Sequence, residues 1–191
     1  MDIVLLGIGV GLASVAGLRA FLPLALAALF AALGLFELAL PFAGDGWWPV
    51  FGGLAALSVL EAVLDKIGSL ERVFNIAMVP VRALAGGMLF AAGGGFEAGA
   101  GSVPWLIVGA VIAGVVAVFK VLLRPPARDA SSGVSTSFLS LIEDVAGLVG
   151  GALALFVPYL PAVLVAFLLF FYARIRKRRG RKFGGLRILG D

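Results

Sequence analysis

The sequence predicts an all-α fold, namely a polytopic helical bundle that is integral to a membrane. Its 191 residues are 62% hydrophobic and only 14% charged, whereas soluble domains are roughly 45–50% apolar and 25% charged. The stretches Phe21–Leu40 and Val103–Phe119 run almost without a charge. Such lengths match the roughly 20 residues that a helix needs to cross about 30 Å of hydrocarbon.

The apolar stretches divide into about six transmembrane helices, which include segments that could be broken or re-entrant. The short turn PYLP joins the last two spans. Tryptophans at the outer ends of the second and fourth spans fit the aromatic belt of a membrane interface. The expected spans are Leu18–Leu40, Trp48–Asp65, Met78–Phe96, Val103–Leu123, Ser135–Val157 and Pro161–Tyr172.

The first span has an alternative description. The amino terminus carries an acid before its apolar run, and that run continues past Arg19, so a cleaved signal peptide is not expected. The whole stretch Ile3–Leu40 is also long enough for two short passes or for a re-entrant hairpin broken near Gly17. Two short passes would give seven spans and place the amino terminus outside.

Fifteen basic residues set the orientation, because Lys and Arg beside short loops stay on the cytoplasmic side. With six spans, both termini are predicted to be cytoplasmic in a bacterial inner membrane. Residues 1–175 form one transmembrane domain and residues 176–191 a basic tail. The tail region holds eight of the bases: Arg174, Arg176, Lys177, Arg178, Arg179, Arg181, Lys182 and Arg187.

Weak internal similarity suggests repeats. The segment ASVAGLRAFLPL, from Ala13, aligns with ASSGVSTSFLSL, from Ala130, and Arg82 lies in a fainter third copy. If the repeats are real, the first, third and fifth spans each follow a break and carry Arg19, Arg82 or a hydroxyl cluster near their start. Such breaks are tolerated at membrane depth only inside protein or beside water.

Charged groups also fall inside the expected spans. If the fifth span starts near Ser135, Glu143 lies about 12 Å along the helix axis, near mid-membrane. Ionisable groups at that depth are costly unless they are paired, neutral or hydrated. Glu143 and Asp144 point about 100° apart on a helix, so we do not expect them to share one partner. Arg19 and Arg82 are the natural counter-charges, because guanidinium forms forked bonds to carboxylates.

Two interpretations of these groups stay open. They could line a polar cavity for an ion or small polar solute, or they could be satisfied ion pairs and helix caps that fix packing. A water-connected cavity at Glu143 and Arg82 would favour the first, and direct, dry pairing the second. Glu61 and Asp65 add an acidic face at i,i+4 spacing. The candidate site residues are Arg19, Glu61, Asp65, Arg82, Ser135, Thr136, Ser140, Glu143 and Asp144.

The composition excludes several chemistries. Cysteine and histidine are both absent, which removes disulfides, cysteine nucleophiles, thiolate or imidazole metal sites and Ser-His-Asp machinery. No cofactor is expected. The basic tail suits anionic lipid, at about 1 kcal/mol per charge near the surface, so no nucleic-acid partner is predicted.

Three motifs carry a resemblance to a known family. These are GLRAFLPL near the start, LEAVLDKI followed by VPVRALAGG, and STSFLSLIEDV before the last hairpin. Over about residues 5–175 the chain resembles an uncharacterised bacterial integral membrane family, domain of unknown function family 4126. The resemblance implies a membrane fold and supplies no activity and no catalytic residue.

Three classes of function remain. A small transporter or channel is the first, because short spans with broken entries and buried charges of both signs resemble small secondary carriers. A membrane enzyme acting on lipid phosphate is the second, with the arginines on the phosphate and a carboxylate as base. The third is a structural or assembly protein whose charges specify packing. The expected partners are the lipid bilayer, anionic lipid at the tail, an ion or small solute and further copies of the chain in a homo-oligomer.

Overall fold

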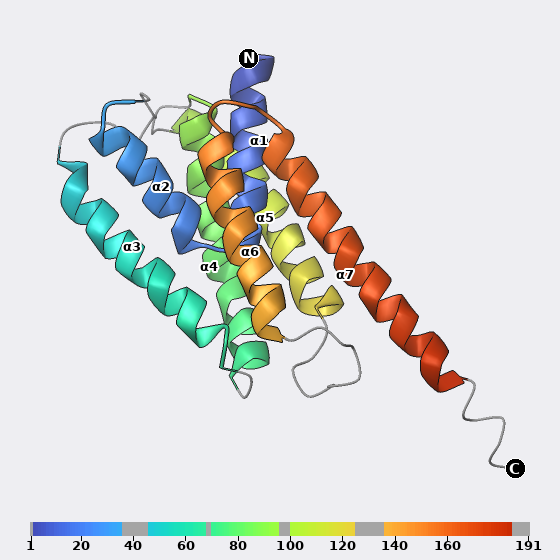
Figure 1. The fold of residues 1–191 in the computed structure, drawn as a ribbon. Coiled ribbons are helices and arrows are strands. Elements are labelled where there is room, and N and C mark those ends of the chain that lie inside the picture. The colour runs from blue at the N-terminus through green and yellow to red at the C-terminus, as the bar shows by residue number, and fades with distance from the viewer. Residues whose placement is uncertain (1, 36–45, 68–69, 96–99, 125–135, 185–191) are drawn as a thin grey trace, which may run out of the picture.

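The computed structural model describes residues 2–35, 46–67, 70–95, 100–124 and 136–184. Within these ranges the chain is all helical and has no strand, which confirms the predicted fold class (Figure 1). The helices are α1 (Ile3–Leu18), α2 (Phe21–Ala32), α3 (Trp47–Leu64), α4 (Glu71–Gly93), α5 (Val103–Leu123), α6 (Thr136–Leu153) and α7 (Leu160–Gly184), with a short 3-10 turn at Ala100–Ser102.

The surface of the bundle is apolar. Large hydrophobic side chains are exposed on several helices, among them Val59 at 65%, Leu84 at 69% and Phe167 at 68%. Among the described residues, α3, α4 and α5 are long and apolar enough to cross a membrane, and α1 and α2 are shorter apolar helices. Exposed apolar surface of this extent suits contact with lipid tails, which are themselves apolar.

The amino-terminal region forms a helical hairpin. Helix α1 packs against α4, α5, α6 and α7, and most of its residues from Gly7 onward are buried, as expected for a helix that is apolar on all sides. It ends at Leu18 and is followed by Arg19, whose backbone is extended. Helix α2 then returns toward the end of the bundle where α1 began (Figure 1). A single first span over Leu18–Leu40 is not confirmed, because α1 and α2 form a hairpin like that of the alternative description; residues 36–40 lie outside the described residues.

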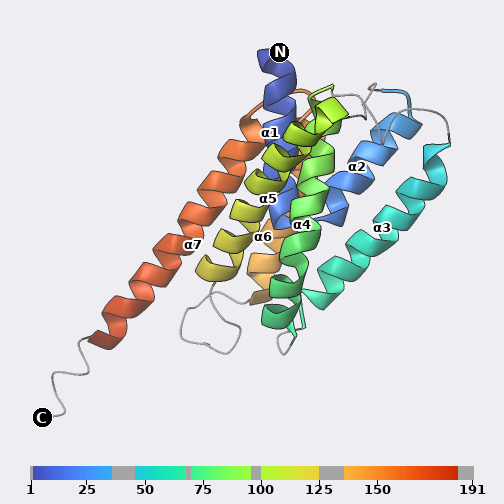
Figure 2. The same cartoon turned by 180° about the vertical axis from the view of Figure 1, so that it is seen from behind.

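The hairpin also decides at which end of the bundle the described chain begins. The Tyr159 hydroxyl, just before α7, donates to the Ile3 carbonyl at 2.8 Å, so α1 starts at the end of the bundle where α7 starts. Helix α7 then runs to the opposite end (Figures 1 and 2). The described chain therefore begins and ends at opposite ends of the bundle, and the prediction that both termini are cytoplasmic is not confirmed. The six-span topology is not confirmed.

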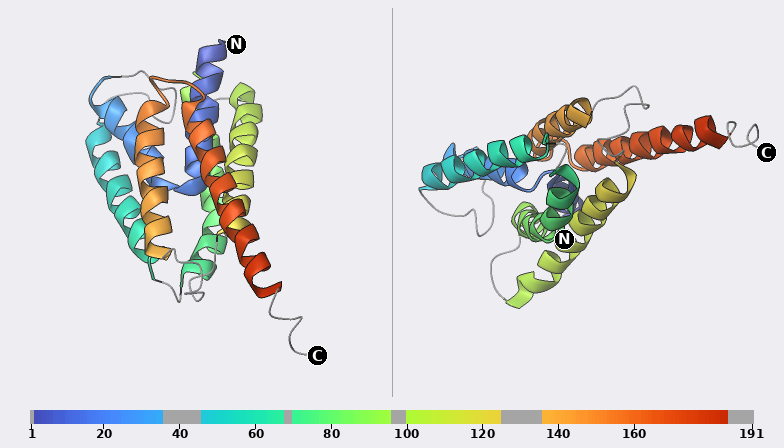
Figure 3. Two further views of the ribbon diagram at one scale, coloured as in Figure 1. Left: turned by 45° about the vertical axis from the view of Figure 1, so that its right-hand side comes forward. Right: turned by 90° about the horizontal axis from the view of Figure 1, so that it is seen from below.

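Two other helix boundaries differ from the prediction. Helix α4 begins at Glu71, well before the expected Met78, and Glu71 and Asn75 in its first turns are buried and paired. Helix α7 continues through residue 175 as one helix and projects from the bundle (Figure 3). Arg19 lies in the break before α2, whereas Arg82 lies inside α4, so the repeat is not confirmed either.

Glycines allow α4 and α5 to approach closely. A Cβ atom added at Gly86 would lie 2.2 Å from the Cβ of Ala113, and one at Gly109 would lie 2.3 Å from the Cβ of Phe90. Only small residues permit such a crossing in a membrane bundle. This packing fixes α4 and α5 beside α1, where both helices contribute charged residues to the interior.

Candidate functional site

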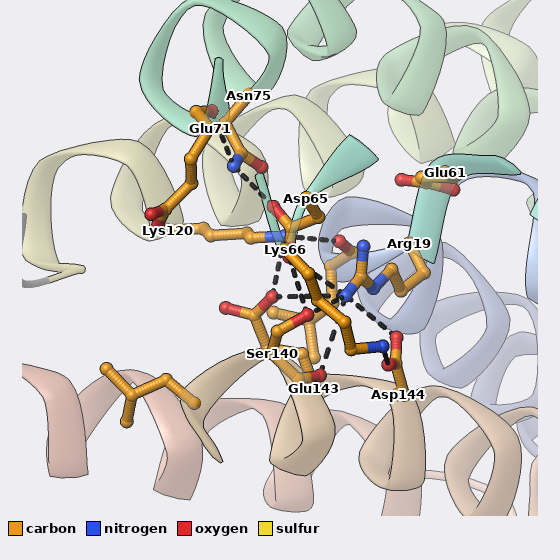
Figure 4. Close-up of polar contacts among 12 residues, drawn as sticks. Arg19, Glu61, Asp65, Lys66, Glu71, Asn75, Lys120, Ser140, Glu143 and Asp144 are labelled. Atoms are coloured by element: carbon orange, nitrogen blue, oxygen red, sulfur yellow. Dashed lines mark hydrogen bonds and ion pairs between the residues drawn. The ribbon is translucent and has the colours of Figure 1, made fainter. Parts of the chain in front are cut away.

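A set of charged and polar side chains is buried together inside the bundle, around the break between α1 and α2 (Figure 4). We call it the buried cluster. Its members come from the hairpin break and from α3, the α3–α4 connection, α4, the end of α5, α6 and α7. They are Arg19, Glu61, Asp65, Glu71, Asn75, Arg82, Lys120, Arg124, Ser140, Glu143 and Tyr172.

Two members of opposite charge form hydrogen bonds to backbone groups at the break between α1 and α2. The Lys120 ammonium donates to the Leu18 carbonyl, at the end of α1, over 3.0 Å. The Glu61 carboxylate accepts from the backbone amides of Ala20 at 3.0 Å and Phe21 at 3.2 Å, at the start of α2. A cation thus meets the negative end of one helix dipole and an anion meets the positive end of the other.

Arg82 joins this break to the rest of the buried cluster. Its Nη2 donates to Glu61 Oε1 at 3.1 Å and to Asn75 Oδ1 at 2.9 Å. The Asn75 amide in turn donates to Asp65 Oδ1 at 2.6 Å. Glu61 and Asp65, four residues apart near the end of α3, are therefore linked through α4.

Asp65 is the most heavily bonded carboxylate. Its Oδ2 accepts from Arg19 Nη2 at 2.9 Å, from Arg124 Nη1 at 2.8 Å and from the Ser140 hydroxyl at 3.0 Å. Two guanidinium groups and a hydroxyl thus converge on one carboxylate oxygen, which compensates the burial of its charge.

Glu143 pairs with cations from α5 and with a hydroxyl from α7. Its carboxylate lies 2.8 Å from Lys120 Nζ and 3.0 Å from Arg124 Nη1, and it accepts from the Tyr172 hydroxyl at 2.7 Å. Glu71 lies 2.8 Å from Nε of the same Arg124. A carboxylate at this depth thus has the compensation that its burial requires.

The predicted pairing between α6 and the hairpin is confirmed for Arg19. Its Nη2 lies 2.7 Å from Asp144 and 3.8 Å from Glu143. The expectation that the two adjacent carboxylates cannot share a partner is wrong, because one guanidinium nitrogen lies within ion-pair distance of both. Arg82 pairs with Glu61 instead. Asp144 is partly exposed and also pairs with Lys66 at 3.0 Å.

The structure brings together seven of the nine predicted site residues: Arg19, Glu61, Asp65, Arg82, Ser140, Glu143 and Asp144. Thr136 begins α6, but its side chain is outside what the structure describes, and Ser135 lies outside the described residues altogether. Sequence reasoning missed Glu71, Asn75, Lys120, Arg124 and Tyr172 as members. The available signal in the sequence was the i,i+4 spacing of Lys120 and Arg124 at the end of an apolar run, which places both bases on one face of a helix.

Charges balance within the described part of the buried cluster. Four cations (Arg19, Arg82, Lys120 and Arg124) face four carboxylates (Glu61, Asp65, Glu71 and Glu143). No group of three or more residues suited to holding a metal ion occurs among the described residues. The ion pairs are direct, which is the arrangement that favours the packing interpretation.

Three arginines nevertheless keep buried nitrogens without a hydrogen-bond partner within the described residues, namely Arg19, Arg82 and Arg124. Nε and Nη1 of Arg19 and of Arg82 are buried and have no hydrogen-bond partner within the described residues. The two side chains are 2% and 0% exposed. Buried donors left unpaired are uncommon, because each carries the cost of its lost hydration. The described cluster therefore has donor capacity for an acceptor-bearing ligand.

Comparison with known proteins identifies the family alone. No curated protein and no solved structure matches the chain. The model of one family, Domain of unknown function (DUF4126), matches residues 6–178. Because that match covers most of the chain, the protein belongs to the DUF4126 family.

Proposed function

We propose that the protein is a small transporter or channel that moves an ion or small polar solute across the bacterial inner membrane through the buried cluster. The observation that carries this proposal is the hairpin break at Arg19, which lies inside the bundle among charges of both signs. Discontinuous helices whose ends meet charged groups are the recurrent substrate sites of secondary transporters.

In the proposed orientation the carboxy-terminal end of α7 faces the cytoplasm. The described bases at that end then share the cytoplasmic side, as the positive-inside rule requires: Lys66 after α3, Arg72 at the start of α4, Arg124 after α5, and Arg174, Arg176 and Lys177 in α7. The amino terminus, with Asp2, faces the other side. The basic tail meets anionic lipid, and the small size of one chain makes a homo-oligomer part of the proposal.

Transport requires that some internal ion pairs exchange partners. Breaking a buried pair without replacement is strongly destabilising, by about 3–5 kcal/mol. A solute that supplies the missing charge or hydrogen bonds lowers that cost, whereas an unsuitable one does not. Selectivity would therefore follow from how well the solute replaces an internal partner of Arg19 or Arg82.

The test is flux into liposomes that contain the purified protein, measured over a panel of inorganic ions and small polar metabolites. Wild type should pass at least one solute faster than protein-free liposomes, and Arg19→Met should remove that flux. Lys66→Met is the matched control, because its pair with Asp144 is partly exposed. Properly folded wild type that passes nothing from a broad panel would contradict the proposal.

A structural or assembly role is the second candidate, and the direct pairing of Glu143 with Lys120 and Arg124 favours it. In that case the charges only specify how the helices pack. Neutralising the Arg82 and Glu61 pair together should then leave cellular function intact as long as the protein folds. Loss of function with retained folding would exclude this candidate.

A further inference from the structure

We infer that Glu61 occupies an anion-binding site at the start of α2, and that a small monoanion of carboxylate size takes its place there. This inference names a class of solute for the proposed function. It rests on the proposed function only for the claim that the bound anion is also the transported solute. The binding step itself can be tested without transport.

The geometry of the site is that of an anion bound at a helix start. Glu61 comes from α3, yet its carboxylate receives the amides of Ala20 and Phe21 at the start of α2 and Nη2 of Arg82 at 3.1 Å. Backbone amides at a helix amino terminus, joined by a guanidinium, are a recurrent anion site in proteins. Helix α2 has no capping side chain of its own, so these amides are available to an incoming acceptor once Glu61 withdraws.

The unpaired guanidinium nitrogens provide a second observation. Arg82 is fully buried, its Nη2 is directed at the Glu61 carboxylate, and its Nε and Nη1 have no partner within the described residues. Arg19, adjacent to Ala20, has the same two nitrogens unpaired. Arg124 also has two nitrogens without a hydrogen-bond partner, but it lies beside Asp65 and Glu143 and does not contact Glu61 in the described residues. The unpaired groups of Arg82 and Arg19 all donate hydrogen bonds, so a ligand that pairs with them is an acceptor and not a cation.

Charge balance sets the charge of the ligand. Four cations and four carboxylates compensate one another in the described cluster while Glu61 is in place. Withdrawal of Glu61 leaves one uncompensated positive charge, which a monoanion neutralises and a dianion overcompensates. Nitrate and acetate are suitable probes, because each presents a planar pair of oxygens like the carboxylate that it replaces.

The experiment uses the full chain in detergent and follows its melting temperature in nitrate or acetate, against gluconate at equal ionic strength. In Glu61→Ala the site is vacant, so nitrate and acetate should stabilise it selectively. Glu61→Ala should bind the two anions with an apparent affinity about tenfold or more above that of wild type, because only those wild-type molecules in which Glu61 has withdrawn can bind an anion. Adding Arg82→Met to Glu61→Ala should remove the effect.

Glu71→Ala is the matched control, because it also deletes a buried carboxylate beside an arginine but not one at the start of α2. It should show no preference for nitrate or acetate over gluconate. If Glu61→Ala does not fold, Glu61→Asp keeps the charge but shortens the side chain, and it should still bind the two anions more tightly than wild type.

The outcomes separate the two claims. Absence of selective stabilisation in the Glu61 variants that fold would overturn the anion site, whatever the flux assay shows. The anion site would also be overturned if adding Arg82→Met to Glu61→Ala left the stabilisation by nitrate and acetate unchanged. Selective binding without any solute flux would uphold the anion site and reject the transport function.

Discussion

Removal of Arg82 should cost the fold several kilocalories per mole, because it leaves its buried partners uncompensated. Arg82 is 0% exposed and Glu61 2%, and their charged atoms are 3.1 Å apart. In Arg82→Met the Glu61 carboxylate keeps two backbone amides as its only donors from the described part of the chain, and Asn75 Oδ1 loses the donor that it has from Arg82. Breaking a buried pair in this way costs about 3–5 kcal/mol, which is a factor of roughly a hundred to several thousand in the folding equilibrium.

The assay is equilibrium unfolding in mixed detergent micelles, run as a double-mutant cycle with Glu61→Gln. The double variant should recover part of the loss, with a coupling energy above about 1 kcal/mol. Lys66→Met is the control, since its half-exposed pair with Asp144 should be worth under about 1 kcal/mol. An Arg82→Met protein within about 1 kcal/mol of wild type, or a cycle without coupling, would refute the reasoning.

Further changes test the packing and the topology. Gly86→Leu should prevent close approach of α4 and α5 and lower the melting temperature strongly, whereas Gly52→Leu, where an added Cβ meets nothing within 4 Å, should be nearly neutral; equal effects would reject the close crossing. Tyr172→Phe removes the hydroxyl that donates to Glu143 and should cost about 1–3 kcal/mol in unfolding free energy, a loss that Glu143→Gln should reduce. Reporters fused to the amino terminus and to the end of the tail should be active on opposite sides of the membrane, and activity on the same side would contradict the hairpin.

Much of the fold followed from composition and apolar length, because each long apolar helix satisfies its own backbone and needs no distant partner to be recognised. Apolar length alone did not distinguish the break between α1 and α2 from one continuous span. The break depends on Lys120 and Glu61, which lie far along the chain and reach Leu18 and Ala20 only in the folded bundle. Without those partners, one span starting near Leu18 satisfied the length rule equally well.

The candidate site was predictable in part for a related reason. Arg19, Glu143 and Asp144 were recognised because charge inside an apolar span is costly and must be compensated. Which cation meets which carboxylate was not predictable, since that depends on helix rotation and long-range packing. Lys120 was not recognised as a member of the cluster, because its burial three residues before the end of α5 depends on the same long-range packing.

The most direct test of the central claim is nitrate flux into liposomes that contain the wild-type protein, compared with Arg82→Met reconstituted to the same density. Nitrate stays ionised near neutral pH and does not cross as a neutral acid, so its uptake reports a protein pathway. We expect wild type to pass nitrate well above protein-free liposomes and Arg82→Met to pass little. Wild-type flux at the protein-free level, or equal flux through the variant, would contradict the transport of a small monoanion through the buried cluster.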